Sequence, residues 1–204
     1  MPMNFCGKPR HVPDIFPNSR MWAKRLKMMK KLLLLSTLLL GGCVEIPDKV
    51  TPVSHFELQR YLGTWYEIAR LDHMFERGLE QVSATYTIRQ DGGVKVLNKG
   101  YDPESKQWNE AEGKAYFADR PDEGFLKVSF FGPFYGSYIV MDTDYERYTM
   151  ISGPDHSYLW ILARKPVLDK GQLERLMKKA DEAGFDTSKL IFVNQKAEIE
   201  NADR

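Results

Sequence analysis

One cysteine and one run of three polar residues have the types that could do chemistry. Cys43 ends an apolar run, LLLLSTLLLGGC, that begins at Leu32, so a thiol suited to covalent modification stands at a segment boundary. Asp155, His156 and Ser157 have the types of a hydrolytic triad, but they follow a Gly-Pro turn and are consecutive. Adjacent residues rarely meet as nucleophile, base and orienting acid. We therefore expect no catalytic residue among them.

The sequence does not predict a metal or cofactor site. His55, His73 and His156 lack ligand-like spacing with cysteines or carboxylates. The chain also contains no phosphate-binding loop and no dinucleotide fingerprint. If the protein were an enzyme, Glu67 would be the acid to test, because the alternation of its segment allows it to face inward. We expect no cofactor and no metal.

The apolar run before Cys43 predicts an export signal. Residues 32–42 would form a helix of about 16 Å, which is too short for a bilayer core of about 30 Å. Lysines precede the run and two glycines end it, as in a secretory signal. The sequence LGGC at 40–43 resembles a bacterial lipobox, which implies that Cys43 is lipidated and becomes the mature N-terminus. An ordinary signal or a core helix with a chance cysteine is the alternative. Val44, rather than aspartate, follows the cysteine. In this respect the sequence resembles lipoproteins of enteric-type bacteria that are sorted to the outer membrane.

The position of this signal divides the chain. Met28 and Met29 stand where a signal should start, so we interpret the residues before them as an upstream extension; a long basic leader is the alternative. The predicted segments are 1–27 (extension), 28–42 (signal peptide), 43–53 (lipidated N-terminus and tether), 54–195 (domain) and 196–204 (tail). The part from Cys43 has 21 basic and 27 acidic residues, a net charge of −6, which argues against nucleic acid as a partner. With Cys6 removed and Cys43 lipidated, no disulfide can form.

The domain repeats short alternating segments between turns, which predicts an all-β fold. The expected strands are 64–70, 83–88, 94–101, 112–118, 125–131, 137–142, 147–152 and 158–164. A helix is predicted within 166–184, where Asp169 can cap its start and Gly184 its end. A strand-like stretch, 190–195, follows. We predict an eight-stranded up-and-down antiparallel β-barrel with one C-terminal α-helix packed outside; a sandwich is the alternative.

The alternation also predicts which side chains line the lumen, because charged residues must face water. The predicted lumen residues are Ala84, Tyr86, Val96, Asn98, Gly113, Ala115, Phe117, Leu126, Val128, Phe130, Tyr138, Val140 and Trp160. Gly113 and Ala115 are small, which leaves room for a ligand unless large neighbours fill the gap. Two further stretches are apolar at the expected barrel mouth. Met74 and Phe75 would contact ligand or membrane, or pack as a lid, and 130–138 would form an apolar rim or a plain aromatic turn.

Three motifs in order resemble the signature regions of lipocalins. They are Gly63-Thr64-Trp65, Asp142-Thr143-Asp144-Tyr145 and Arg164. The stretches YLGTWYEIARLDHMFERGL and KVSFFGPFYGSY are similar to the bacterial members, whose relatives also carry a lipobox. The likeness covers roughly 50–195. We interpret Gly63, Trp65 and Arg164 as structural, because an arginine on a tryptophan plug gives a cation–π contact of about 0.5–2 kcal/mol; a ligand contact by Trp65 is the alternative.

The sequence therefore favours a membrane-anchored carrier that binds lipid without altering it. A lumen about one acyl chain wide suits a fatty acid or a lysophospholipid, whose head group Asn98, Tyr86 and Tyr138 would orient. The family resemblance implies a preference for lysophospholipids, storage or transport in the bacterial envelope, and a lipid anchor in the outer membrane facing the periplasm. A homodimer is compatible with the sequence. The alternatives are a lipocalin-type enzyme acting on a lipid and a structural envelope lipoprotein.

Overall fold

The computed structural model describes residues 44–196 of the 204-residue chain. The predicted extension, signal peptide, lipidated Cys43 and most of the tail lie outside the described residues. The elements are α2 (Leu58–Tyr61), β1 (Gly63–Arg70), β2 (Glu80–Ile88), β3 (Val94–Asp102), β4 (Gln107–Phe117), β5 (Phe125–Ser129), β6 (Gly136–Thr143), β7 (Tyr148–Ser152), β8 (Leu159–Ala163), α3 (Lys170–Glu182), η2 (Thr187–Lys189) and β9 (Ile191–Phe192).

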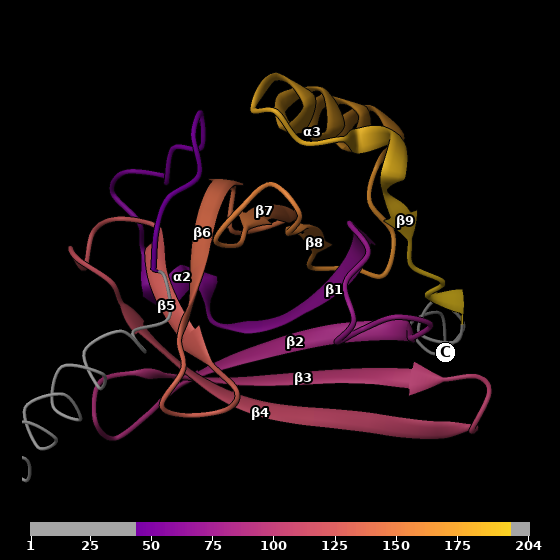
Figure 1. Cartoon of the computed structure of the whole chain (residues 1–204), viewed down its shortest axis with the longest axis horizontal. Coiled ribbons are helices and arrows are strands. Elements are labelled where there is room, and N and C mark those ends of the chain that lie inside the picture. Colours follow the sequence, from indigo (N-terminus) through magenta and orange to yellow (C-terminus); the bar gives the residue numbers. More distant parts are fainter. Residues whose placement is uncertain (1–43, 197–204) are drawn as a thin grey trace, which may run out of the picture. The chain divides into compact units, whose positions relative to one another are not determined.

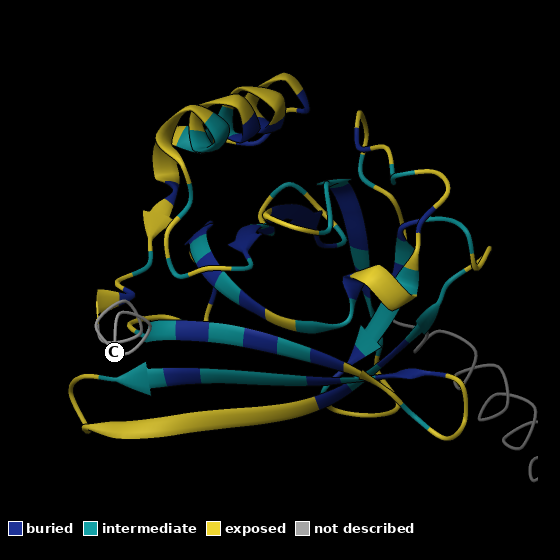
Figure 2. Cartoon of the chain, turned by 180° about the vertical axis from the view of Figure 1, so that it is seen from behind, coloured by how far each residue is buried: buried dark blue, intermediate teal, exposed yellow. Residues whose placement is uncertain are grey.

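Strands β1 to β8 form a closed antiparallel ring, and α3 lies outside it (Figure 1). Each strand pairs with the next, and β1 pairs with both β2 and β8, which closes the barrel. The predicted fold class is confirmed. Several strands differ in length from the predicted ranges, and two differ most. β4 starts five residues before the expected 112, and only Ile191–Phe192 of the expected strand 190–195 is a strand. The outer half of β4 is solvent-exposed and lacks the burial on which the prediction depended (Figure 2).

The alternating strand directions place the connections at two ends of the barrel. Segment 89–93, segment 118–124, segment 144–147 and helix α2 lie at one end, which we call the closed end. The connections 71–79, 103–106, 130–135 and 153–158 lie at the other end, which we call the mouth.

The barrel has apolar residues packed on both faces of its wall. Inside, Trp65 and Val140 belong to a cluster with the tyrosines of the lumen. Outside, Ile139 and Ile161 pack with Leu176 of α3. Helix α3 shows its buried face to the barrel in Figure 2. It begins where Asp169 accepts a hydrogen bond from the backbone of Gln172, as the sequence predicts.

The segment before the barrel is packed against β6. The hydroxyl of Ser137, at the mouth end of β6, donates to the carbonyl of Glu45 at 2.6 Å. Val50 is buried in the outer cluster, and the amide of Val53 donates to the carbonyl of Val140. The predicted tether therefore runs along the wall from the mouth towards the closed end.

Residues at the C-terminal end of the domain complete the seam between β1 and β2. These strands pair only from Gly63 to Tyr66 of β1, near the closed end. Beyond that, β9 takes the free edge of β1. The buried amide of Gln195 donates to the carbonyls of Glu67 and Val82, one on each side of the seam, at 2.9 and 2.8 Å. Gln195 thus joins the two strands where their direct pairing has stopped.

Candidate ligand site

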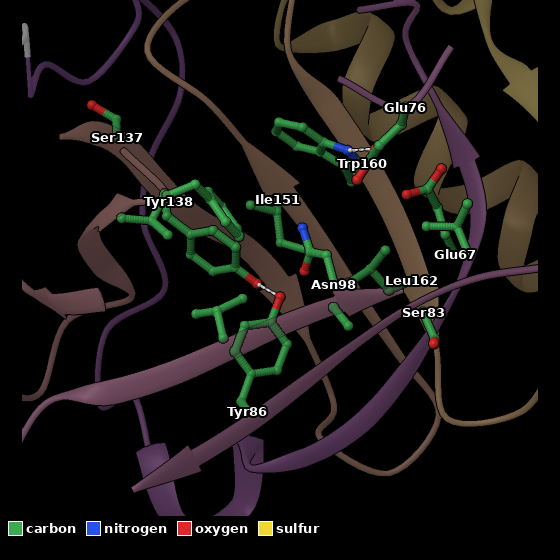
Figure 3. A pocket seen from close by; sticks show the side chains of 15 residues that line it. Glu67, Glu76, Ser83, Tyr86, Asn98, Ser137, Tyr138, Ile151, Trp160 and Leu162 are labelled. Atoms are coloured by element: carbon green, nitrogen blue, oxygen red, sulfur yellow. Dashed lines mark hydrogen bonds between the residues drawn. The ribbon is translucent and has the colours of Figure 1, made fainter. Parts of the chain in front are cut away.

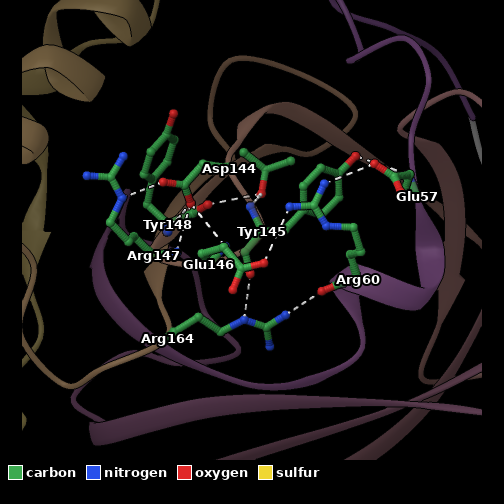
Figure 4. A network of polar contacts seen from close by, with 9 residues as sticks. Glu57, Arg60, Asp144, Tyr145, Glu146, Arg147, Tyr148 and Arg164 are labelled. Carbon is green, nitrogen blue, oxygen red and sulfur yellow. Dashed lines mark hydrogen bonds and ion pairs between the residues drawn. The ribbon is translucent and has the colours of Figure 1, made fainter.

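A tryptophan and an arginine plug the closed end. Trp65 is fully buried, and the Arg164 guanidinium carbon lies 3.7 Å from the centre of its ring. Arg164 donates to the carbonyls of Arg60, Thr64 and Tyr145 at 2.7–3.1 Å (Figure 4). The indole nitrogen of Trp65 donates to the carbonyl of Tyr61 at 2.8 Å. Every polar group of the plug thus meets a fixed partner, and Trp65 does not line the lumen cavity.

The second signature motif holds the loop below this plug. The carboxylate of Asp144 accepts hydrogen bonds from the backbone amides of Glu146, Arg147 and Tyr148 (Figure 4). Partial burial raises the pKa of Asp144, but these bonds and the Arg147 charge outweigh it and leave the pKa below its ordinary value. The loop is therefore fixed where Tyr145 offers its carbonyl to Arg164.

A cavity of about 100 Å³ occupies the mouth half of the barrel (Figure 3). This volume is well above the roughly 10–15 Å³ that one water needs. Eight predicted lumen residues line it: Ala84, Tyr86, Val96, Asn98, Val128, Phe130, Tyr138 and Trp160. Glu67, which the sequence predicted only as an acid able to face inward, and Leu162 of β8 line it too. The sequence did not predict the other lining residues, which are Glu76, Val82, Ser83, Ser137 and Ile151.

The other predicted lumen residues lie elsewhere. Ala115 and Leu126 line a second void of only about 10 Å³ beneath the first. Gly113, Phe117 and Val140 line neither space. A Cβ atom at Gly113 would lie 2.9 Å from the ring of Phe130, so the missing side chain makes room for that ring. The inference that a small residue at 113 leaves space for ligand does not hold, since alternation predicts the face of a residue but not its neighbours.

A chain of tyrosine hydroxyls separates the two spaces. Tyr138 is hydrogen-bonded to Tyr61 at 2.7 Å and to Tyr86 at 2.8 Å. Tyr86 and Tyr138 line both the cavity and the smaller void. Burial raises the pKa of Tyr61 to about 12 and raises those of Tyr86 and Tyr138 well above their ordinary value. The three side chains are therefore neutral and form a polar partition across an apolar lumen.

A buried ionic cluster borders the cavity near the mouth. The Arg70 guanidinium lies 2.6 Å from a carboxyl oxygen of Glu67, and both side chains are almost completely buried. Arg70 also donates to the carbonyl of Glu76, whose carboxylate accepts from the indole of Trp160 at 3.1 Å and lies 3.3 Å from His73. The sequence could not place these contacts, because Arg70 ends a strand and Glu76 lies in the connection that follows.

The two acids of this cluster have different affinities for a proton. Burial raises the pKa of Glu67 well above its ordinary value, and the charge of Glu76 raises it further, against the opposing effect of Arg70. Burial also raises the pKa of Glu76, but His73, Trp160 and Arg70 outweigh it and leave the pKa lowered. Of these two acids, Glu67 therefore has the higher affinity for a proton, and the surroundings of Glu76 favour its charged form.

One polar atom of the cavity lacks a partner. The side-chain oxygen of Asn98 is buried and accepts no hydrogen bond from residues 44–196. An unpaired buried acceptor costs about 1–3 kcal/mol. Asn98 lies between the tyrosine partition and the ionic cluster in Figure 3. A hydroxyl or protonated carboxyl of a ligand in this cavity would satisfy it.

The triad-like residues at the mouth do not form a catalytic arrangement. Asp155 accepts from the hydroxyl of Ser157, while His156 contacts the carbonyl of Ala183 at 3.0 Å. His156 also packs on the ring of Phe185, outside the barrel. The histidine is thus held by the end of α3 and does not serve Ser157 as a base.

The described part of the chain contains neither a metal-binding cluster nor a helix that could span a membrane. No group of three or more His, Cys, Asp or Glu side chains within it is arranged to hold a metal ion. No helix within residues 44–196 is both long and apolar enough to cross a bilayer.

A closed eight-stranded barrel with an outer helix, a Trp-Arg plug and an internal cavity defines a class of protein. The sequence model of the family described as lipocalin-like domain matches residues 56–195, and the chain belongs to this family. The chain is 55% identical to outer membrane lipoprotein Blc of Vibrio cholerae over 165 residues, 80% of this chain and 96% of that protein. It is 54% identical to Blc of Escherichia coli K12 over 150 residues, 73% of this chain and 85% of that protein.

More distant proteins extend this likeness. The chain is 30% identical to rat apolipoprotein D over 164 residues, covering 76% of this chain and 84% of that protein. Insecticyanin from the tobacco hornworm has a similar structure, with a TM-score of 0.57 and 23% identity over 76% of this chain and 87% of that one. The cockroach allergen Per a 4 also has a similar structure, with a TM-score of 0.58 and 19% identity over 71% of this chain and 91% of that one. The two structural likenesses show the shared fold.

Proposed function

We propose that the protein is a lipid-anchored, non-catalytic carrier that binds a fatty acid or the acyl chain of a lysophospholipid. The observation that carries this proposal is the cavity, whose wall is mostly apolar. Its polar groups are the unpaired oxygen of Asn98, the tyrosine partition, the Glu67 cluster and the serines at 83 and 137. Apolar walls with a few placed polar groups are typical of small-molecule sites. The acyl chain lies against Val96, Val128 and Leu162, and the polar end meets Asn98 or Glu67.

The same proposal places the carrier in the outer membrane, facing the periplasm, where it stores or transports lipid. The lipobox-like sequence at 40–43 and the names of the most similar relatives support this location. The enzyme alternative requires a reacting pair in the cavity. Glu67 and Glu76 both line the cavity, but the partner of Glu67 is the guanidinium of Arg70, which is not a nucleophile.

The ligand test uses one substitution in the lumen and a matched one outside. Ala84 is buried and lines the cavity, whereas Thr87, three residues further along β2, is exposed. Ala84→Trp should abolish binding of a fluorescent fatty acid because the indole fills the ligand space, and Thr87→Trp should leave binding unchanged. Titration and mass spectrometry of lipid extracted from the purified protein measure both. If the unsubstituted protein bound neither the probe nor any extracted lipid, the proposal would be wrong.

The anchor test concerns Cys43. Stable membrane attachment needs more than one acyl chain, at about 0.8 kcal/mol per buried CH₂. Cys43→Ser removes every chain that this residue would carry, so the variant should leave the membrane fraction and still bind fatty acid in solution. A variant that stayed with the membranes would show that the anchor lies elsewhere.

A further inference from the structure

Four large apolar side chains at the mouth of the barrel are exposed to solvent. Met74 and Phe75 in the β1–β2 connection are 77% and 63% exposed, and Phe131 and Phe134 in the β5–β6 connection are 74% and 55% exposed. These four residues are called the mouth rim below. They come from connections on opposite sides of the eight-stranded ring. The exposure of Met74 and Phe75 argues against the alternative in which these two residues pack as a lid.

The path of the N-terminal segment brings the anchor point to the same end. Glu45 is held by Ser137, which follows Phe134 by three residues at the start of β6. Cys43 is two residues before Glu45, and consecutive Cα atoms are 3.8 Å apart. The Cα atom of Cys43 therefore lies within about 7.6 Å of that of Glu45. An acyl group on Cys43 would thus be attached beside the mouth, far along β6 from the closed end.

The outer wall next to the rim has the chemistry of a lipid interface. The ring of Tyr135 lies between two ammonium groups, with Lys114 at 5.9 Å and Lys127 at 5.5 Å from its centre. Tyrosine rings favour the head-group level of a membrane, and lysines there are attracted to lipid phosphates. A second such pair lies on the protruding β3–β4 hairpin, where the ammonium of Lys99 is 4.6 Å from the ring centre of Trp108.

We propose that the mouth rim docks on the bilayer that holds the protein's own acyl anchor. The cavity then opens towards the lipid surface, and a lipid enters the lumen from the bilayer without crossing water. The occupant of the rim is a lipid surface, because the attachment point, the exposed apolar side chains and the flanking lysines all lie at this end. Entry of lipid from the bilayer rests on the proposed carrier function. The orientation of the barrel rests instead on the mouth rim, the attachment point and the lysines.

The first experiment measures orientation. Single cysteines replace Phe131 at the rim and Glu146 at the closed end, whose side chain is 74% exposed, both in a Cys6→Ser background. The lipidated full-length products carry an environment-sensitive fluorophore in vesicles of phosphatidylethanolamine and phosphatidylglycerol. A quencher attached to lipid tails should quench the label at 131 and leave that at 146 unchanged. Equal quenching of the two labels would overturn the proposal. So would a label at 131 that a second copy of the protein already covers when no vesicles are present.

The second experiment measures lipid entry. The double variant Phe131→Glu, Phe134→Glu places carboxylates where the bilayer is apolar, so transfer of a fluorescent fatty acid from vesicles to the anchored protein should slow by roughly tenfold. Uptake of the same fatty acid from dilute aqueous solution should not change, because neither residue lines the cavity. Val167→Glu is the control, since Val167 is 60% exposed but follows the closed end of β8.

The outcomes of this pair separate the two proposals. Unchanged transfer in the double variant, or equal slowing by Val167→Glu, would overturn docking and leave lipid binding intact. Failure of the unsubstituted protein to bind fatty acid from solution would contradict the carrier function, while the quenching result would still decide the orientation.

Discussion

Each end of the barrel contains a buried or half-buried arginine, and the partners of the two arginines differ in kind. At the closed end, Arg164 stacks on Trp65 and donates only to backbone carbonyls, which do not titrate. Near the mouth, Arg70 meets Glu67 and lies beside Glu76, which do titrate. The closed end is thus a fixed plug, while the mouth half keeps a cavity and an unpaired acceptor. We therefore expect substitutions at the closed end to affect stability most, and substitutions in the mouth half to affect ligand binding most.

The largest expected difference between the ends is the cost of removing a tryptophan. Trp65→Ala should lower the free energy of unfolding by about 3–5 kcal/mol, as is usual for a large aromatic in a filled core. Trp160→Ala should cost clearly less, because Trp160 already borders a cavity. Denaturant unfolding measures both. Equal losses would show that the two ends are packed alike.

A smaller effect is expected from Arg164→Lys. An ammonium cannot stack flat on Trp65 and also reach three carbonyls, so the variant should lose about 1.5–3 kcal/mol, the range for hydrogen bonds to a charged group. Fatty-acid affinity should be unchanged, because Arg164 is remote from the cavity. Parallel melts and titrations check this. A loss of binding without a loss of stability would mean that the plug contributes to the ligand site.

The mouth half should respond to pH through Glu67. Its pKa is raised in the folded state, so above the ordinary value of 4.5 the native protein keeps a proton that the unfolded chain has lost. Stability from this group is therefore full below pH 4.5 and falls as pH rises towards the folded pKa, by up to about 1.4 kcal/mol per pH unit.

Substitution isolates this contribution. Glu67→Gln keeps an acceptor for Arg70 but cannot titrate, so its free energy of unfolding should depend less on pH above 4.5. Glu146→Gln, at the exposed closed end, is the matched control and should follow the unsubstituted protein. Denaturant unfolding at a series of pH values gives the slopes. If Glu67→Gln showed the same slope as the control, Glu67 would not be the titrating group.

The smallest effect concerns the tyrosine partition. Tyr138→Leu should join the cavity to the void beneath it, so that longer fatty acids gain affinity by about fourfold for each additional CH₂ that is buried, at about 0.8 kcal/mol each. Tyr138→Phe keeps the ring and should not change the preferred chain length. Titration with a series of chain lengths distinguishes them. An unchanged preference in Tyr138→Leu would mean that another residue separates the two spaces.

The sequence was sufficient for the ring of strands and for most of the lumen, because alternation reports which face of a strand meets water. It could not show that Phe130 fills the space at Gly113, since that depends on a neighbour from another strand. It also could not predict the contact between Arg70 and Glu76, because that contact depends on the conformation of the loop between them. The packed course of the segment before β1 was missed because Ile46, Val50 and Val53 are separated by Pro47 and Pro52 and form no continuous apolar pattern.

The bridge made by Gln195 has a consequence for the order in which the protein is made. The barrel wall is joined at the β1–β2 seam by a residue that lies 128 positions after Glu67. A chain that is synthesised or threaded across a membrane from its N-terminus cannot complete this seam until residue 195 has emerged. Until then β1 presents an open edge, a site at which a strand of another chain can pair. A chaperone that covers this edge of β1 would therefore act before the final residues of the domain arrive.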